Sequence, residues 1–313
     1  MIYFKKFCYT LLFFCCSAIA DQQHFSKVEH PNHYQFNYQW QDINAKKRSI
    51  TFSLTKNILF DQFRNFKTYK ADLAQQFINK KIKRRLRKKP LADVTINFHN
   101  QDNSINISGK SQLSINQAYT AINDMKLEIS EQYLKDNFYH RFITHNQVNA
   151  IKPDHKRFAS LSAKNLKPIK PVILDNVSIK NIRDVTDFAL GFVQSIPYST
   201  LESRITSAGS GFNPPLKLLW ENQGDCDSKV TLTAALLRSV MPRINIALVF
   251  IDNHALIGVN IAAEIGSTEM TIEHDGITYL LAEPTGPALL ALGTISEASQ
   301  QAILQGQYTI EAM

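Results

Sequence analysis

The N-terminal half of the chain alternates between apolar and polar side chains in several short stretches, which is the pattern of half-buried β-strands. YQFNYQW (34–40) alternates aromatic with polar residues, and SITFSLT (49–55) alternates apolar with polar ones. DVTINFH (93–99) and SINISG (104–109) flank a short polar segment, which predicts a β-hairpin. Two strands and a hairpin are therefore expected in this half.

Two segments of the same half place apolar residues at helical spacing. Residues 69–88 and 114–141 are the expected amphipathic helices. The resulting order ββαββα predicts a basic α+β domain over residues 21–150. Residues 151–172 contain three prolines and show no clear period, so we expect a linker there.

The C-terminal half shows longer apolar runs. A helix is expected over residues 181–195, and a second one, apolar nearly all round and therefore buried, begins at GDCDSK (224–229). Two strands are expected at 244–252 and 254–261, and a hairpin with its turn at 274–276 follows.

The first twenty residues suggest export. They contain two lysines, a short apolar stretch and the small-x-small pattern of Ala18 and Ala20, which is typical of a cleavable signal peptide. We therefore expect a periplasmic or secreted protein from which residues 1–20 are removed. Removal leaves Cys226 as the single cysteine, and a lone thiol in an exported protein is either buried and inert or reactive.

Charge divides the chain sharply. Residues 21–170 carry 26 Lys and Arg against 12 Asp and Glu, whereas residues 171–313 carry 7 against 15, which supports a boundary near residue 170. One predicted helix contains a run of eight cations, namely Lys80, Lys81, Lys83, Arg84, Arg85, Arg87, Lys88 and Lys89. This run is expected either to meet an anionic surface, such as lipid headgroups or acidic cell-wall polymers, or to be a solvated helix face. Export argues against a nucleic-acid partner.

Cys226 lies where a polar loop becomes the buried helix. Free backbone amides and the helix dipole stabilise an anion at such a position, which lowers the pKa of a thiol. The neighbouring carboxylates of Asp225 and Asp227 act in the opposite direction. They are expected either to cap the helix or to bind a cation.

A nucleophilic cysteine needs a base, and His254 at the start of a predicted strand could lie over the end of the helix. Glu283 ends a later strand, which in an antiparallel sheet can adjoin the start of the His254 strand, so its carboxylate could orient the imidazole. Asp252 is a weaker orienting candidate, because near neighbours along a strand point to opposite faces. His274, in the predicted turn, is an alternative base.

These segments together resemble the transglutaminase-like superfamily, which has a papain-like Cys-His-acid core. GDCDSK, HALIGV and YLLAEPT carry the resemblance, with FVQSIPY before the cysteine and AALLRSV after it, over roughly residues 181–287. The resemblance implies a transglutaminase-like domain over residues 173–313, in which the cysteine-bearing helix packs on an antiparallel sheet. It also implies Cys226 as nucleophile, His254 as base and Glu283 as orienting acid, although most members carry Asp at the third position.

Trp220 and Gln223 are candidate oxyanion or auxiliary residues. Papain-type enzymes have an oxyanion glutamine six residues ahead of the cysteine; Trp220 occupies that offset here, whereas Gln223 lies only three residues ahead of Cys226. The indole of Trp220 could instead have a packing role, and the backbone N–H of Cys226 is a further donor. The chain is also similar to bacterial transglutaminase-like cysteine proteinases with a GDCED signature, which need calcium. Calcium is therefore the one cofactor suggested here, with Asp225 and Asp227 as ligands, although Ser replaces the second acid of that signature.

The expected function is that of an exported hydrolase, a periplasmic cysteine protease or amidase that cleaves amide or peptide bonds with a Cys-His-Glu catalytic triad. Its substrate would be a protein or peptide of the cell envelope. The alternative is a non-catalytic envelope protein whose basic N-terminal domain docks an anionic polymer or a protein partner. A phosphate-binding Gly-rich loop, a paired-cysteine zinc motif and a G-x-S-x-G elbow are all missing from the sequence.

Overall fold

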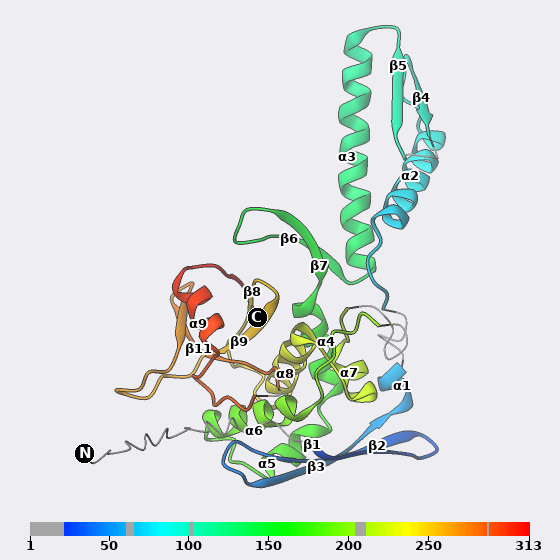
Figure 1. The fold of residues 1–313 in the computed structure, drawn as a ribbon. Helices are drawn as coiled ribbons and strands as arrows, with labels where there is room; N and C mark the ends of the chain where they lie inside the picture. The colour runs from blue at the N-terminus through cyan, green and yellow to red at the C-terminus, as the bar shows by residue number, and fades with distance from the viewer. Residues whose placement is uncertain (1–21, 61–65, 100–102, 204–210, 287) are drawn as a thin grey trace, which may run out of the picture.

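The computed structural model describes residues 22–60, 66–99, 103–203, 211–286 and 288–313. Its helices and antiparallel sheets confirm the expected α+β class (Figure 1). The expected signal peptide lies outside the described residues. None of the helices within these ranges is both long and apolar enough to cross a membrane.

An antiparallel sheet at the N-terminus has the order β1-β2-β3. Its strands are β1 (Gln22–Glu29), β2 (His33–Gln41) and β3 (Lys47–Thr55), followed by the short helix α1 (Lys56–Phe60). β2 and β3 confirm the strands predicted from alternation, and Tyr38 and Trp40 on one face are buried. That face packs on α6 (Ile182–Ser195), where the ring of Phe192 lies 4.9 Å from Tyr38 and 5.5 Å from Trp40.

A second antiparallel sheet has the order β10-β11-β9-β8-β12. Its strands are β8 (Ile246–Ile251), β9 (His254–Val259), β10 (Thr271–His274), β11 (Ile277–Ala282) and β12 (Thr309–Ala312). Leu248 belongs to the core shared with α8 (Cys226–Val240), whereas the next residue, Val249, packs in a cluster with Ile303 of α9 (Glu297–Leu304). Both faces of this sheet are therefore covered, which explains the continuous apolar run of β8.

One large core joins the two halves of the chain. It contains Trp40 of β2, Leu236 of α8 and Leu248 of β8, together with residues of α7 (Pro215–Glu221). The N-terminal sheet thus shares its core with the C-terminal half and does not belong to a separate domain of residues 21–150. Alternation in a strand shows that one face is buried but does not show what covers it.

The expected linker, residues 151–172, is instead structured. It contains the end of β7 (Asn149–Pro153), all of α4 (His155–Asn165) and most of α5 (Ile169–Leu174), and Phe158 is fully buried. Its prolines mark element boundaries: Pro153 ends β7, Pro168 is the N-cap of α5, and Pro171 lies in the first turn of α5. A proline is tolerated there because the first helical amides have no partner within the helix.

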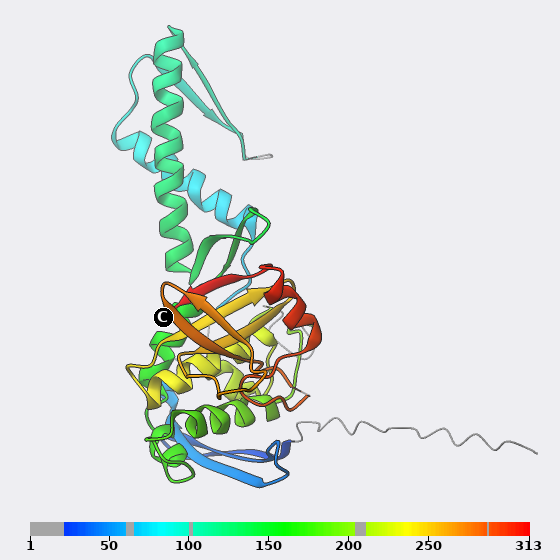
Figure 2. The same cartoon turned by 90° about the vertical axis from the view of Figure 1, so that its left-hand side faces the viewer.

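The arm, residues 71–136, projects from the rest of the molecule (Figures 1 and 2). It consists of α2 (Ala71–Lys88), β4 (Val94–Phe98), β5 (Ile105–Gly109) and α3 (Gln112–Asp136). The β4–β5 hairpin is as predicted. α3 ends at Asp136, before the predicted residue 141, and β6 (Tyr139–Ile143), which pairs with β7, follows it. Small apolar clusters around Ile82 and Ile122 hold the arm together, apart from the main core.

Candidate active site

Cys226 is the first residue of α8, as the sequence predicts. Asp225 is the N-cap of this helix: its Oδ1 accepts a hydrogen bond from the Ser228 amide at 2.9 Å and another from the Ser228 hydroxyl. Asp225 therefore has the capping role, one of the two roles expected for it. The backbone N–H of Cys226 lies in the first turn, where amides have no partner within the helix.

Gly224 fixes the path of the chain just ahead of Cys226. Its N–H donates to the Pro197 carbonyl at 3.2 Å, and its own carbonyl accepts from the Ser199 amide at 3.1 Å. A Cβ atom at this position would lie 2.7 Å from Cδ1 of Leu218, so a larger residue would force the Leu218 side chain to shift. These bonds hold the loop after α6 beside the cysteine.

Cys226 and His254 line one cavity of about 500 Å³. The cavity lies between the start of α8 and the turn that joins β8 to β9. Cys226 Sγ lies 3.9 Å from the carbonyl oxygen of Asn253 in that turn and 3.7 Å from Oδ1 of Asp227. Other residues that line this cavity include Phe142, Lys152, Tyr198, Glu202, Phe250 and Asp252.

His254 and Glu283 are in contact. Nε2 of His254, the first residue of β9, lies 3.2 Å from Oε1 of Glu283, which follows the last residue of β11. The register explains this contact, because Ala282 of β11 pairs with Ile257 of β9 in the antiparallel sheet. The predicted adjacency of the two strand ends is therefore correct.

Glu283 is held in place by two serines at the start of α9. Its Oε1 accepts hydrogen bonds from the hydroxyl of Ser296 at 2.9 Å and from that of Ser299. Burial raises the pKa of Glu283, but hydrogen bonds from His254 and the serines outweigh it, so the net pKa lies below its ordinary value. Sequence reasoning missed both serines, although Ser-x-x-Ser ahead of a helix is a recognisable N-cap pattern.

The Cys226 thiol is held in its protonated form. Burial raises its pKa to about 12, and the charges of Asp227 and Asp225 add to the effect. Burial together with the charge of Asp227 also raises the pKa of Asp225, to about 7. The expected lowering of the thiol pKa by the helix dipole is therefore outweighed in this arrangement.

His155 lies behind Asp227, and sequence reasoning missed it. Its Nε2 is 3.7 Å from Oδ2 of Asp227, and its Nδ1 is 3.1 Å from the hydroxyl of Thr231. The ring is fully buried, and burial lowers its pKa to about 4. The imidazole is therefore neutral near pH 7 and leaves the negative charge of Asp227 in place beside the thiol.

Trp220 and Gln223, the expected oxyanion donors, are not among the residues that line the cavity. The indole of Trp220 packs edge-on against Tyr34 at 4.7 Å and Phe60 at 5.0 Å, and the Lys27 ammonium lies 3.7 Å from its centre. Trp220 therefore has the packing role. The remaining expected donor is the backbone N–H of Cys226.

The alternative residues take other positions. His274 pairs with Asp275 at 3.4 Å in the β10–β11 turn and does not line the cavity, so the structure does not favour it as the base. Asp252 does line the cavity but lies 3.8 Å from Nδ1 of His145, and Glu283 is the carboxylate that contacts His254.

Within the described ranges, no group of three or more His, Cys, Asp and Glu side chains is arranged to hold a metal ion. Of the two expected calcium ligands, Asp225 already uses Oδ1 in the helix cap, and Asp227 lies against His155 and the thiol. Calcium binding at this pair stays a prediction.

No family model, curated protein or solved structure matches this chain. The resemblance to the transglutaminase-like superfamily therefore depends on the residues and geometry described above.

Proposed function

We propose that the protein is an exported thiol hydrolase of the transglutaminase-like type, which cleaves amide or peptide bonds in the cell envelope. Cys226 on a buried helix is the nucleophile, His254 on the adjacent antiparallel sheet is the base, and Glu283 orients the base. The observation that carries the proposal is the contact of 3.2 Å between His254 and the buried Glu283, beside a cavity that Cys226 also lines.

The contact assigns a role to each nitrogen of the imidazole. Glu283 accepts the proton on Nε2, so Nδ1 is the nitrogen with a free lone pair. Because the thiol is protonated at rest, His254 removes its proton as sulfur attacks the carbonyl carbon. This route is general-base catalysis and does not need a stable thiolate–imidazolium pair.

The remaining steps follow from the same groups. The negative charge that develops on the carbonyl oxygen is stabilised by the free backbone N–H of Cys226 at the start of α8. His254 then returns its proton to the nitrogen of the leaving amine as the C–N bond breaks, which leaves a thioester on Cys226. Water, deprotonated by His254, attacks the thioester, and the acid product and the thiol are released.

The direct test is Cys226→Ala together with His254→Ala, assayed with a thiol-reactive amide mimic and with peptide amides. Both variants should lose hydrolysis, and Cys226→Ala should also lose labelling, because Cys226 is the only cysteine in residues 21–313. His274→Ala is the matched control and should retain full activity, because this histidine lies away from the cavity. Full activity of Cys226→Ala would exclude the mechanism.

A second candidate, a non-catalytic binding protein, is favoured by the raised pKa of the thiol. In that case Cys226 would be inert towards an amide mimic over the whole pH range in which the protein is folded. Labelling that depends on His254 would exclude this candidate.

A further inference from the structure

The cations of α2 lie on more than one side of the helix. Arg85 faces α3 and forms a bidentate ion pair with Glu128, with N–O distances of 2.6 and 2.7 Å. On another side of the helix, a hollow of about 820 Å³ runs along α2 towards the β4–β5 hairpin. We call it the basic groove; its lining residues are Gln76, Phe77, Asn79, Lys80, Lys81, Lys83, Arg84, Arg87 and Asn103.

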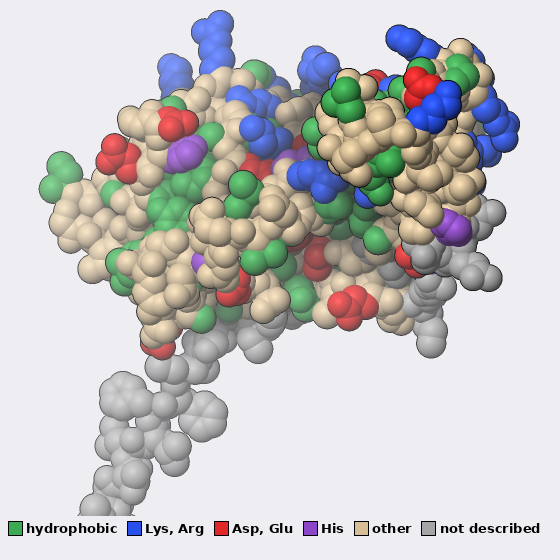
Figure 3. Space-filling view, turned by 90° about the horizontal axis from the view of Figure 1, so that it is seen from above, with side chains coloured by type: hydrophobic (Ala, Val, Ile, Leu, Met, Phe, Trp, Pro, Cys, Tyr) green, Lys and Arg blue, Asp and Glu red, His purple; other side chains and the backbone are tan. Residues whose placement is uncertain are grey.

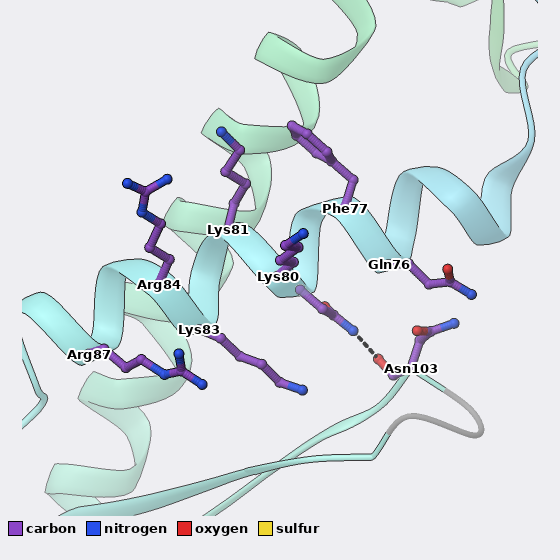
Figure 4. Close-up of a pocket in the computed structure, with 9 residues that line it drawn as sticks. Gln76, Phe77, Lys80, Lys81, Lys83, Arg84, Arg87 and Asn103 are labelled. Carbon is purple, nitrogen blue, oxygen red and sulfur yellow. Dashed lines mark hydrogen bonds between the residues drawn. The ribbon is translucent and has the colours of Figure 1, made fainter.

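The basic groove contains five cations and, among the described residues that line it, no Asp or Glu. Figure 4 shows Lys80 between two rows, with Lys81 and Arg84 on one side and Lys83 and Arg87 on the side of the hairpin. In the view from above, Lys and Arg side chains lie at several places on this face of the molecule (Figure 3). The electrostatic potential of this surface is therefore strongly positive.

The cations of the basic groove repel one another. Lys80 and Arg84 are four residues apart on the helix, and like charges at this spacing destabilise a helix. The sequence of α2 offers no carboxylate after Asp72 to offset this repulsion. An anion bound along the groove would remove it.

The apolar side of α2 is already covered. Ile78 and Ile82 pack in one cluster with Ile129 of α3, so α2 has no free apolar face to insert into a lipid bilayer. Phe77 contacts Tyr133, with ring centres 5.0 Å apart, and the Lys81 ammonium lies 5.1 Å from its ring. The groove therefore offers little aromatic surface for stacking nucleic-acid bases.

Amide side chains lie at one end of the groove. Asn79 Nδ2 donates to the Asn103 carbonyl at 3.0 Å, which ties Asn103 to α2, and the amide of Gln76 is exposed beside it (Figure 4). Amides bind hydroxyl groups by accepting and donating hydrogen bonds. From Lys80 to Arg87 the cations extend about 10 Å along the helix axis, which is long enough for several groups of an extended chain.

We propose that the basic groove binds an acidic polysaccharide, whose negative groups contact Lys80, Arg84 and Arg87 and whose hydroxyl groups contact the amides. The groove lies on the arm, whereas Cys226 lies in the main body, so polysaccharide binding does not depend on the hydrolase activity proposed above. The arm would hold the protein on an acidic polymer while the body acts on material nearby.

The test measures binding of the full chain to alginate by calorimetry at several salt concentrations. Lys80→Glu/Arg84→Glu/Arg87→Glu should weaken binding by about tenfold or more at low salt, and should reduce the salt dependence by about one unit of slope per cation removed. Lys88→Glu/Lys89→Glu/Lys126→Glu makes the same change in charge at exposed positions outside the basic groove and should bind nearly as the unmodified protein does. Circular dichroism checks that α2 remains folded.

Neutral dextran, vesicles of anionic phospholipid and single-stranded DNA are the comparison ligands. The proposal requires that alginate binds more tightly than each of them and that only the groove variant loses this preference. Equal weakening by both triple variants would overturn it, because the effect would then depend on net charge alone. Tighter binding to the vesicles or to DNA would overturn it in favour of that ligand.

Discussion

Oε1 of Glu283 accepts hydrogen bonds from both Ser296 and Ser299 while it lies 3.2 Å from Nε2 of His254. One carboxylate oxygen of Glu283 thus contacts side chains at the start of α9 and at the start of β9. A side chain with so many partners has little freedom to rotate, which fixes the imidazole in one orientation and one tautomer.

Glu283→Gln should lower the rate of amide hydrolysis by on the order of 10²–10⁴, because a neutral amide can hold the imidazole in the wrong tautomer. The loss should be in kcat, measured with a peptide amide, while thermal unfolding stays near that of the unmodified protein. Glu297→Gln, at the first position of α9 and without contact to His254, is the matched control. Equal rates for Glu283→Gln and the unmodified protein would show that Glu283 does not orient the base.

Asp227→Asn should lower the pKa of the Cys226 thiol, because the Asp227 charge is one of the causes that raise it. Removing a charge this close shifts a pKa by about 1–3 units, so alkylation of the thiol at a fixed pH should become about tenfold faster or more. The measurement is the rate of reaction with iodoacetamide against pH. Asp252→Asn is the matched control, since Asp252 also lines the cavity but is not a cause of the shift; a similar acceleration in both variants would contradict the assignment.

The helix and the strands that carry the site residues could be predicted, because each of these elements follows from a local pattern of apolar and polar residues. The apolar run after Cys226 predicts a buried helix, and the alternating or continuous apolar runs around His254 and before Glu283 predict strands. The contact between His254 and Glu283 then follows from antiparallel pairing. The serines that hold Glu283 come from α9, whose approach to the sheet is a matter of tertiary packing.

Two other features depend on relationships that distance along the sequence does not encode. The offset of Trp220 from Cys226 left both an oxyanion role and a packing role open, and the packing role follows from the backbone, because Asn222 adopts a left-handed conformation, with φ 52°, and ends α7 between the two residues. The chain therefore turns, and Trp220 packs against Tyr34 and Phe60. The prediction of a linker over residues 151–172 was wrong for a similar reason. Its prolines lie at the boundaries of β7 and α5, whose tertiary packing is not visible in the local sequence.

Lys229→Met tests a buried charge that the proposed mechanism does not use. The side chain is fully buried, its ammonium donates to the Ile196 carbonyl at the end of α6, and burial lowers its pKa to about 7. The unfolded chain has the ordinary value of 10.5, so between these two values it binds more protons than the folded protein does. This lysine therefore makes the folded state more stable as pH rises through that range, by up to about 1.4 kcal/mol per pH unit.

The free energy of unfolding, measured with urea from about pH 6 to about pH 9.5, should rise relative to that of Lys229→Met as pH increases. Lys164→Met, on the exposed side of α4, is the matched control and should follow the unmodified protein at every pH, because an exposed ammonium has no burial cost to lose. If the difference in the free energy of unfolding between the unmodified protein and Lys229→Met did not change with pH, Lys229 would stay charged in the core. In that case the carbonyls at the end of α6, with the negative end of the helix dipole, stabilise the ammonium enough to offset its burial.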